Sequence, residues 1–256
     1  MRNLDNNTEG LEMNEEPRWA QLRQVVLATL DHAGDTDLVR RTLQLGPSFD
    51  DPELAAIGLA DATMPVGADT YLEVCAPMTT DHQVAKWLAK VGGSSGWCLS
   101  TQVPNLDGVH ERCAQLGVRI AVEAQALGHE IVQLHPLDVG ILLELDSFVP
   151  RDEWFWDDLE GAKMAQSQRG VFVDDIVGVE IAVEDPAAMA AKWAIIIGLR
   201  APELIENGAV LSFSGRPIRF VGLVGRRGLV AVDMHTSDRA RVGDSVELCN
   251  TEIRFV

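Results

Sequence analysis

Two glutamates stand inside otherwise apolar stretches of the chain, and they are its clearest candidates for chemistry. Glu73 lies in TYLEVCA (residues 70–76) and Glu144 in ILLELD (residues 141–146). In a strand, alternation puts Tyr71, Glu73 and Cys75 on one face. A carboxylate there either faces solvent or lines a wet cavity, where burial and a second nearby charge would raise its pKa and suit it to acid–base catalysis. Both glutamates are therefore candidate catalytic residues.

Two further residues have both a structural and a functional interpretation. His135 directly precedes Pro136 at the end of an apolar stretch. It is either a turn residue or a group that contacts substrate or transfers protons near a pocket mouth. Trp97 is either a core residue or a pocket wall. We keep His135 as a catalytic candidate and Trp97, with Tyr71, as candidates for substrate binding.

The common catalytic and cofactor motifs give no alternative centre. The sequence has no phosphate-binding loop, serine nucleophile elbow or HExxH helix. Its four cysteines form no CxxC pair, so a structural zinc site is not expected. Their wide spacing is typical of free thiols in a reducing compartment.

The composition excludes several classes of partner. The formal net charge of −18 disfavours nucleic acid and anionic membrane surfaces, both of which need a basic protein surface. No apolar run is long enough to span a bilayer. Residues 1–18 are polar and acidic, which predicts a disordered tail. We therefore expect a soluble, globular, cytoplasmic protein.

A strand–helix unit that ends in Leu-Gly or Ile-Gly recurs three times, and this unit must position the candidate residues. Such repetition indicates a fold built by duplication. The copies span residues 24–46, 98–117 and 177–198. The pattern predicts a first module with strands at 22–30, 55–60 and 70–76 and a helix at 35–45, followed by a helix at 79–90. It predicts a second module over 97–146 and a third over 176–224. A fourth, over 229–255, is too short for a helix.

Four segments in this order resemble the vicinal-oxygen-chelate superfamily, which includes glyoxalase I, methylmalonyl-CoA epimerase, extradiol dioxygenases and bleomycin-resistance proteins. They are TYLEVCAP (70–77), GGSSGWCLSTQVPNLDGVHERCAQLGVRI (92–120), IVQLHPLDVGILLELD (131–146) and VEIAVEDPAAMAAKWAIIIGL (179–199). The resemblance is greatest to the glyoxalase-like and epimerase-like branch. It implies an α+β fold in which duplicated βαβββ modules form cupped, incompletely closed sheets.

The resemblance also implies a site inside the cup of the first module pair. Metal-dependent members of the superfamily hold the ion with residues on the first and last strands of each module. The matching positions here are Gln24, Glu73, Cys98 and Glu144, or Trp97 in place of Cys98 if the alignment slips by one residue. The usual histidines are missing at the first and third positions. Two interpretations stay open: a divalent metal ion held by Gln24, Glu73 and Glu144, or a metal-free cup in which a glutamate is the general base.

These expectations combine into one organisation. A first glyoxalase-like domain spans residues 19–150, a linker 151–170, and a second, shortened domain 171–256. The first cup would carry out isomerase-type or lyase-type proton abstraction on an oxygenated small molecule, with Gln24 and Cys98 contacting the substrate. The alternative is a non-catalytic protein of the same fold that sequesters a small molecule. The second domain, with Gly178 where a first ligand would fall, is expected to hold no metal and to pack on the first. Its shortened fourth module leaves apolar surface that a second copy could cover, which suggests a homodimer.

Overall fold

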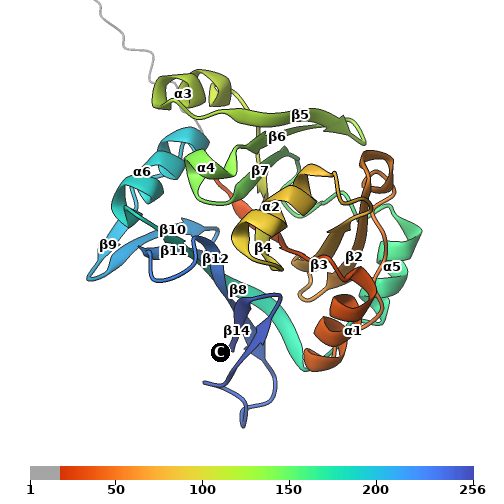
Figure 1. Ribbon diagram of the computed structural model, residues 1–256. Helices are drawn as coiled ribbons and strands as arrows, with labels where there is room; N and C mark the ends of the chain where they lie inside the picture. Colours follow the sequence, from red (N-terminus) through yellow and green to blue (C-terminus); the bar gives the residue numbers. More distant parts are fainter. Residues whose placement is uncertain (1–17) are drawn as a thin grey trace, which may run out of the picture.

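The computed structural model describes residues 18–256, so the acidic tail expected at 1–18 lies outside the described residues apart from Arg18. Figure 1 shows two curved sheets with the helices around them. Each sheet has seven strands. This architecture confirms the α+β fold of duplicated modules expected from the sequence.

The first sheet combines two modules with matching pairings. β1 and β4, the opening strands of the two modules, run antiparallel at its centre. Each opening strand then pairs in parallel with the last strand of its own module, β1 with β3 and β4 with β7. The sheet contains β1 (Gln21–Ala28), β2 (Leu59–Pro65), β3 (Tyr71–Pro77), β4 (Ser95–Val103), β5 (Ile120–Ala126), β6 (His129–Leu134) and β7 (Leu142–Ser147), in the order β2-β3-β1-β4-β7-β6-β5.

The second sheet repeats this plan. β8 and β12 are antiparallel at the centre, β8 pairs in parallel with β11, and β12 pairs in parallel with β14. Its last module runs from β12 to β13 without a helix, as its length predicts. The sheet contains β8 (Val173–Val183), β9 (Glu203–Ile205), β10 (Gly208–Phe213), β11 (Arg216–Gly222), β12 (Gly228–Thr236), β13 (Ser245–Leu248) and β14 (Thr251–Phe255), in the order β13-β14-β12-β8-β11-β10-β9.

Local sequence signals fix the helix ends. Asp31 and Asp185 cap α1 and α6, since each side chain accepts a hydrogen bond from a first-turn backbone N–H. Gly198, with φ of +82°, ends α6 in the left-handed conformation that favours glycine. The helices are α1 (His32–Thr42), α2 (Gln83–Val91), α3 (Val109–Leu116), α4 (Pro136–Val139), α5 (Glu160–Ser167) and α6 (Pro186–Ile197).

The two sheets share one hydrophobic core. It takes alternate residues of β1, β4, β7, β8 and β12 together with the inner sides of α1, α3 and α6. Trp193 of α6, fully buried, donates its indole N–H to the Val139 carbonyl at 2.9 Å. Gly96 lies so near Leu229 that a Cβ there would be 2.6 Å from the leucine side chain. Because of this packing, the shared core occupies one face of the first sheet and the cup residues occupy the other.

Two expected elements differ in the structure, and the segment expected as a linker has structure of its own. The strand expected at 55–60 is instead a 3₁₀ turn (Ala55–Ile57) that Gly58, with φ of +83°, reverses into β2. The helix expected at 79–90 begins at Gln83, because His82 caps it by accepting from the Val84 N–H. The segment read as a linker, 151–170, contains α5 and packs its aromatic residues into a buried cluster.

Candidate active site

A continuous line of polar side chains crosses the inner face of the first sheet, the face opposite the shared core. Its members, which we call the polar row, come one each from β3, β1, β4, β7 and β6. Their inward direction follows from alternation, because their strand neighbours, such as Val25, Leu99 and Leu143, belong to the shared core. The polar row consists of Glu73, Gln24, Ser100, Glu144 and Gln133.

Hydrogen bonds connect the polar row in two groups, one on β3 and β1 and the other on β4, β7 and β6. The Gln24 side-chain amide donates to the Glu73 carboxylate. Ser100 Oγ donates to Glu144 Oε1 at 2.6 Å, and Gln133 Nε2 donates to Glu144 Oε2 at 2.6 Å. Gln24 and Ser100 are direct partners in the β1–β4 register. The structure thus brings Gln24, Glu73 and Glu144 to one face, as expected from the sequence.

Strand register puts Ser100 at the third position of the row, where the sequence suggested Cys98 or Trp97. Ser100 pairs with both Gln24 and Glu144, whereas Cys98 pairs with Val26 and Leu142. Cys98 instead packs with Cys75 beneath α2, and Trp97 packs against the same apolar cluster. The β1–β4 ladder shifts register at two points, and these irregularities are not visible in the sequence.

Burial disfavours the ionised form of the carboxyl groups in the cup. Burial raises the pKa of Glu73 well above its usual range, and the nearby carboxylates of Asp61, Asp51 and Glu144 raise it further. Burial also raises the pKa of Glu144, while the donors Ser100 and Gln133 oppose that shift. The pKa of Asp61 on β2 is raised to about 7, mainly by burial. Such perturbed groups are typical of functional sites.

Aromatic side chains from the segment after β7 cover the cup. Residues 148–156, which we call the aromatic segment, place Phe148, Trp154, Phe155 and Trp156 in one buried cluster with Tyr71 and Phe49. Trp156 Nε1 donates to Gln24 Oε1 at 3.3 Å. Tyr71 packs edge-on against Phe49, and burial raises its pKa to about 12. The polar row is therefore in contact with the chain's own indole ring.

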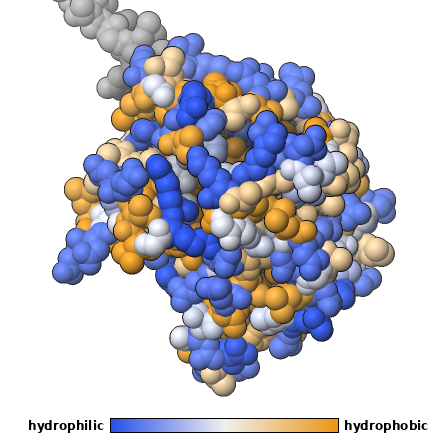
Figure 2. All heavy atoms as spheres, in the orientation of Figure 1, coloured by the Kyte–Doolittle hydropathy of each residue, from blue (hydrophilic) through white to orange (hydrophobic). Residues whose placement is uncertain are grey.

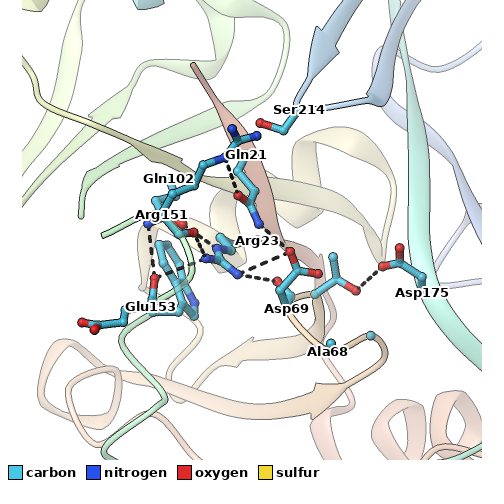
Figure 3. Close-up of polar contacts among 12 residues, drawn as sticks. Gln21, Arg23, Ala68, Asp69, Gln102, Arg151, Glu153, Asp175 and Ser214 are labelled. Carbon is cyan, nitrogen blue, oxygen red and sulfur yellow. Dashed lines mark hydrogen bonds and ion pairs between the residues drawn. The ribbon is translucent and has the colours of Figure 1, made fainter. Parts of the chain in front are cut away.

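A buried arginine holds the aromatic segment in place. Arg23 of β1 is 1% exposed. Its guanidinium donates to the carbonyls of Arg151 at 2.7 Å and Glu153 at 3.2 Å and to Gln102 Oε1 at 2.7 Å. Gln102 Nε2 in turn donates to the Phe148 carbonyl at 3.0 Å. Figure 3 shows these contacts converging on Arg23. The only indication of these contacts in the sequence is an arginine inside an apolar strand.

The same network reaches the second sheet. Asp69 is the counterion of Arg23 at 3.6 Å and also accepts from Arg216 of β11 at 2.8 Å. Arg216 bonds Asp175 of β8 at 3.0 Å, and Thr70 Oγ1 donates to Asp175 at 2.8 Å. Figure 3 shows Asp69 between Arg23 and Asp175. The cover of the first cup and the second sheet therefore share one set of polar contacts.

His135 has a capping contact. Its Nδ1 accepts from the Leu137 N–H at 3.2 Å, which caps α4, and the helix begins at Pro136. This contact accounts for its place before a proline. His135 makes no hydrogen bond to the polar row that would support a role in proton transfer.

The donor set of the polar row does not fit a resident metal ion. The Gln24 oxygen that would be a ligand accepts the Trp156 indole N–H, and Glu73 accepts the Gln24 amide N–H. The third position is a serine that donates to Glu144, and the row contains no imidazole. Within residues 18–256, no cluster of three or more His, Cys, Asp or Glu side chains could hold a metal ion. We therefore derive no chemistry through a metal.

The second sheet has ion pairs at the equivalent positions. The pairings that relate Gln24, Glu73, Ser100 and Glu144 relate Gly178, Arg219, Asp233 and Arg254 in the second sheet. Arg219 bonds Asp233 at 2.5 Å, and Arg254 bonds Glu180 through two contacts of 3.0 Å. The second cup thus has a network of opposite charges where the first has a polar row.

A comparison with solved structures found similarity to two epimerases and to a hypothetical protein. Methylmalonyl-CoA epimerase from Mycobacterium tuberculosis is 24% identical over 51% of this chain and 89% of its own, with a TM-score of 0.43. The Streptomyces coelicolor epimerase in complex with 2-nitronate-propionyl-CoA is 23% identical over 52% of this chain and 99% of its own, with a TM-score of 0.44. A hypothetical protein from Staphylococcus aureus matches 93% of this chain and 99% of its own at 9% identity, with a TM-score of 0.65.

The paired modules give the chain a fold of two curved sheets in one polypeptide, and the Staphylococcus aureus protein shares this fold over 93% of the chain. No family model matches the sequence. A comparison with curated proteins found no match either. Among residues 18–256, no helix combines the length and apolar character needed to cross a membrane.

Proposed function

We propose that this chain is a small-molecule enzyme of the glyoxalase-like group, which abstracts a proton beside a carbonyl or similar oxygenated group in its first cup. One observation carries the proposal: two buried carboxyl groups of raised pKa, each hydrogen-bonded to a polar side chain of a central strand, lie on the same face of the sheet. Fold alone does not define the reaction, so the proposal depends on these residues.

Glu144 is the proposed base. Its two oxygens each accept one hydrogen bond, from Ser100 and from Gln133, and these donors favour the ionised form that accepts a proton. Glu73 is held by Gln24 and stands among other carboxylates, which favour its neutral form. Two carboxyl groups in different protonation states are what acid–base exchange at one carbon atom requires.

A substrate needs the aromatic segment to move. Trp156 occupies the space over Gln24, and Arg23 and Gln102 hold the segment's backbone. A closed aromatic cover also excludes water from a reaction whose intermediate is a carbanion or enolate. The structure corresponds in this proposal to the closed form, and the substrate enters when residues 148–156 swing out.

Exchange of a substrate proton with solvent tests this function without knowledge of the product. The protein is incubated in D₂O with racemic methylmalonyl-CoA, other 2-substituted acyl thioesters and 2-hydroxy or 2-keto acids, and deuterium at C2 is followed by NMR. We expect exchange with at least one class, and none with Glu144→Gln. Elemental analysis of protein purified without added metal accompanies it, and stoichiometric metal would contradict the metal-free mechanism.

A second candidate function is binding of a small molecule without catalysis, and one hollow favours it. A depression of about 800 Å³ borders the second sheet and is lined mainly by apolar residues, among them Ala182, Val221 and Leu204. Hydrophobic surface shows at the left of Figure 2, where Figure 1 has α6 and β9. Calorimetric binding of an apolar ligand, with no proton exchange in any substrate class, would favour this function. The expected homodimer is tested by light scattering.

A further inference from the structure

Asp146 is a buried carboxyl group that makes no hydrogen bond. It is 0% exposed, and neither of its oxygens has a partner. It lies two positions after Glu144 on β7, and the residue between them, Leu145, points into the shared core. Asp146 and Glu144 therefore share the inner face of the sheet, roughly 7 Å apart along the strand.

The residues around Asp146 leave it without a donor. Its partner on β4 is Gln102, whose amide is already used by Arg23 and by the carbonyls of the aromatic segment. Its partner on β6 is Ile131, which is apolar. The charged or titratable groups on the surrounding elements are Glu144 on β7, Arg23 on β1, His129 and Glu130 on β6, and Arg151, Asp152, Glu153, Asp157 and Asp158 beyond β7.

Glu144 and Asp146 differ in their hydrogen-bond donors, and this difference favours different protonation states of the two groups. Glu144 has a hydroxyl and an amide donor, one on each oxygen. Asp146 has none, and a buried carboxylate without a donor is costly, so the group keeps its proton. Burial raises the pKa of Asp146 well above its usual range, and the Glu144 charge raises it further. The pair is one base and one acid on the same strand.

We propose that Asp146 is a neutral carboxylic acid whose O–H stabilises the oxyanion formed when Glu144 removes the substrate proton. This inference rests on the proposed function. The C–H bond breaks as its proton passes to Glu144, its electron pair forms the C=C bond of an enolate, and the carbonyl π pair moves onto oxygen. That oxygen accepts a hydrogen bond from Asp146, and return of the proton to carbon completes the exchange.

A second unused donor supports this assignment. Trp154 Nε1 is also buried without a partner, in the same aromatic cluster as Phe148, which follows Asp146 by two residues. A fully buried donor and a fully buried acid without partners are uncommon in one region of a folded protein. A substrate oxygen between the cover and β7 would satisfy both.

The test uses the full chain with [4-¹³C]aspartate and follows each side-chain carboxyl by NMR from pH 4 to pH 9. We expect one carboxyl to stay protonated beyond pH 7, to be missing in Asp146→Asn, and to titrate at lower pH in Glu144→Gln. Asp61→Asn, which removes another buried aspartate, is the matched control and should leave that signal. An Asp146 carboxyl that is ionised at pH 7 overturns the proposal.

The second arm measures deuterium exchange of the substrate that the wild-type protein turns over. Asp146→Leu, which removes the donor and keeps the branched shape, should lower the rate by about 10²–10³-fold. Asp146→Asn keeps an N–H donor and should retain more activity than Asp146→Leu. An unchanged rate in Asp146→Leu, with the acid shown to be protonated, overturns the oxyanion role alone. Exchange with no substrate class by the wild-type protein overturns the proposed function and this role with it, while the protonation result stands separately.

Discussion

Trp156 and Gln24, 132 positions apart in the chain, meet through a hydrogen bond of 3.3 Å from indole Nε1 to the side-chain oxygen. The nitrogen of the same glutamine donates to Glu73. Gln24 therefore connects the aromatic segment to a carboxylate of the proposed active site. Any movement of Trp156 away from Gln24 leaves a buried amide oxygen free for a ligand.

Replacement of Trp156 should open the cup. Trp156 is 9% exposed, and Trp156→Ala should lower the free energy of unfolding by about 3–5 kcal/mol, because a large buried ring is lost. The same variant should bind indole in a calorimetric titration, since the cavity retains the Gln24 acceptor. Trp156→Phe, which keeps most of the packing, is the control and should not bind indole. Equal indole binding by both variants would show that Gln24 does not select the ligand.

Glu144→Gln should preserve the fold and abolish activity. The substitution keeps shape and removes the charge, and the Ser100 hydroxyl can rotate to accept from the new amide. Urea denaturation should give a midpoint at or above that of the wild-type protein, because the buried charge at position 144 is removed. Loss of the folded state would assign Glu144 a structural role, and exchange at the wild-type rate would exclude it as the base.

Asp61 should make the protein less stable as the pH rises. Its pKa is about 7 in the folded protein and near 3.8 in the unfolded chain, so between these values only the unfolded state is ionised. The free energy of unfolding should fall between about pH 4 and pH 7, by up to about 4 kcal/mol from this group, and level off above.

Asp61→Asn should remove that slope. Denaturation of both proteins at pH 5 and pH 8 measures the slope. The variant should exceed the wild-type protein in free energy of unfolding by more at pH 8 than at pH 5. Asp138 should have the opposite effect on stability. Arg119 lowers the pKa of Asp138 to about 2, so the stabilisation that the ionised Asp138 contributes is lost only as the pH falls below about 4. Parallel curves for wild-type protein and Asp61→Asn would mean that Asp61 is ionised when folded.

The first sheet should not be stable alone. Trp193 and Leu229 of the second sheet's modules pack on Val139 and Gly96 of the first. A fragment of residues 19–150 should aggregate or lose most of its thermal stability. A fragment of residues 19–170, which restores the aromatic segment, should recover only part of the thermal stability. A monomeric 19–150 fragment with the stability of the full chain would contradict the shared core.

The candidate site was predictable where it depends on local pattern. A glutamate between apolar neighbours on an alternating strand indicated Glu73 and Glu144, and the repeat placed Gln24 beside them. Ser100 was missed because β-bulges shift the β1–β4 register. Trp156 and Arg23 were missed because their contacts join residues more than 100 positions apart. Asp146 was missed because its complete burial without a hydrogen-bond partner depends on how distant segments pack over it.

The ion network of the second cup also constrains how this half of the chain can diverge. Arg219, Asp233, Arg254 and Glu180 neutralise one another, so loss of any single member leaves an uncompensated charge in a partly buried site. Viable changes there must come in compensating pairs, which is strong epistasis. Ser100 and Gln133 of the first cup are uncharged, so their replacement by another uncharged residue needs no compensating change of charge. Single substitutions can therefore accumulate at these positions, while the ion network of the second cup changes only in pairs.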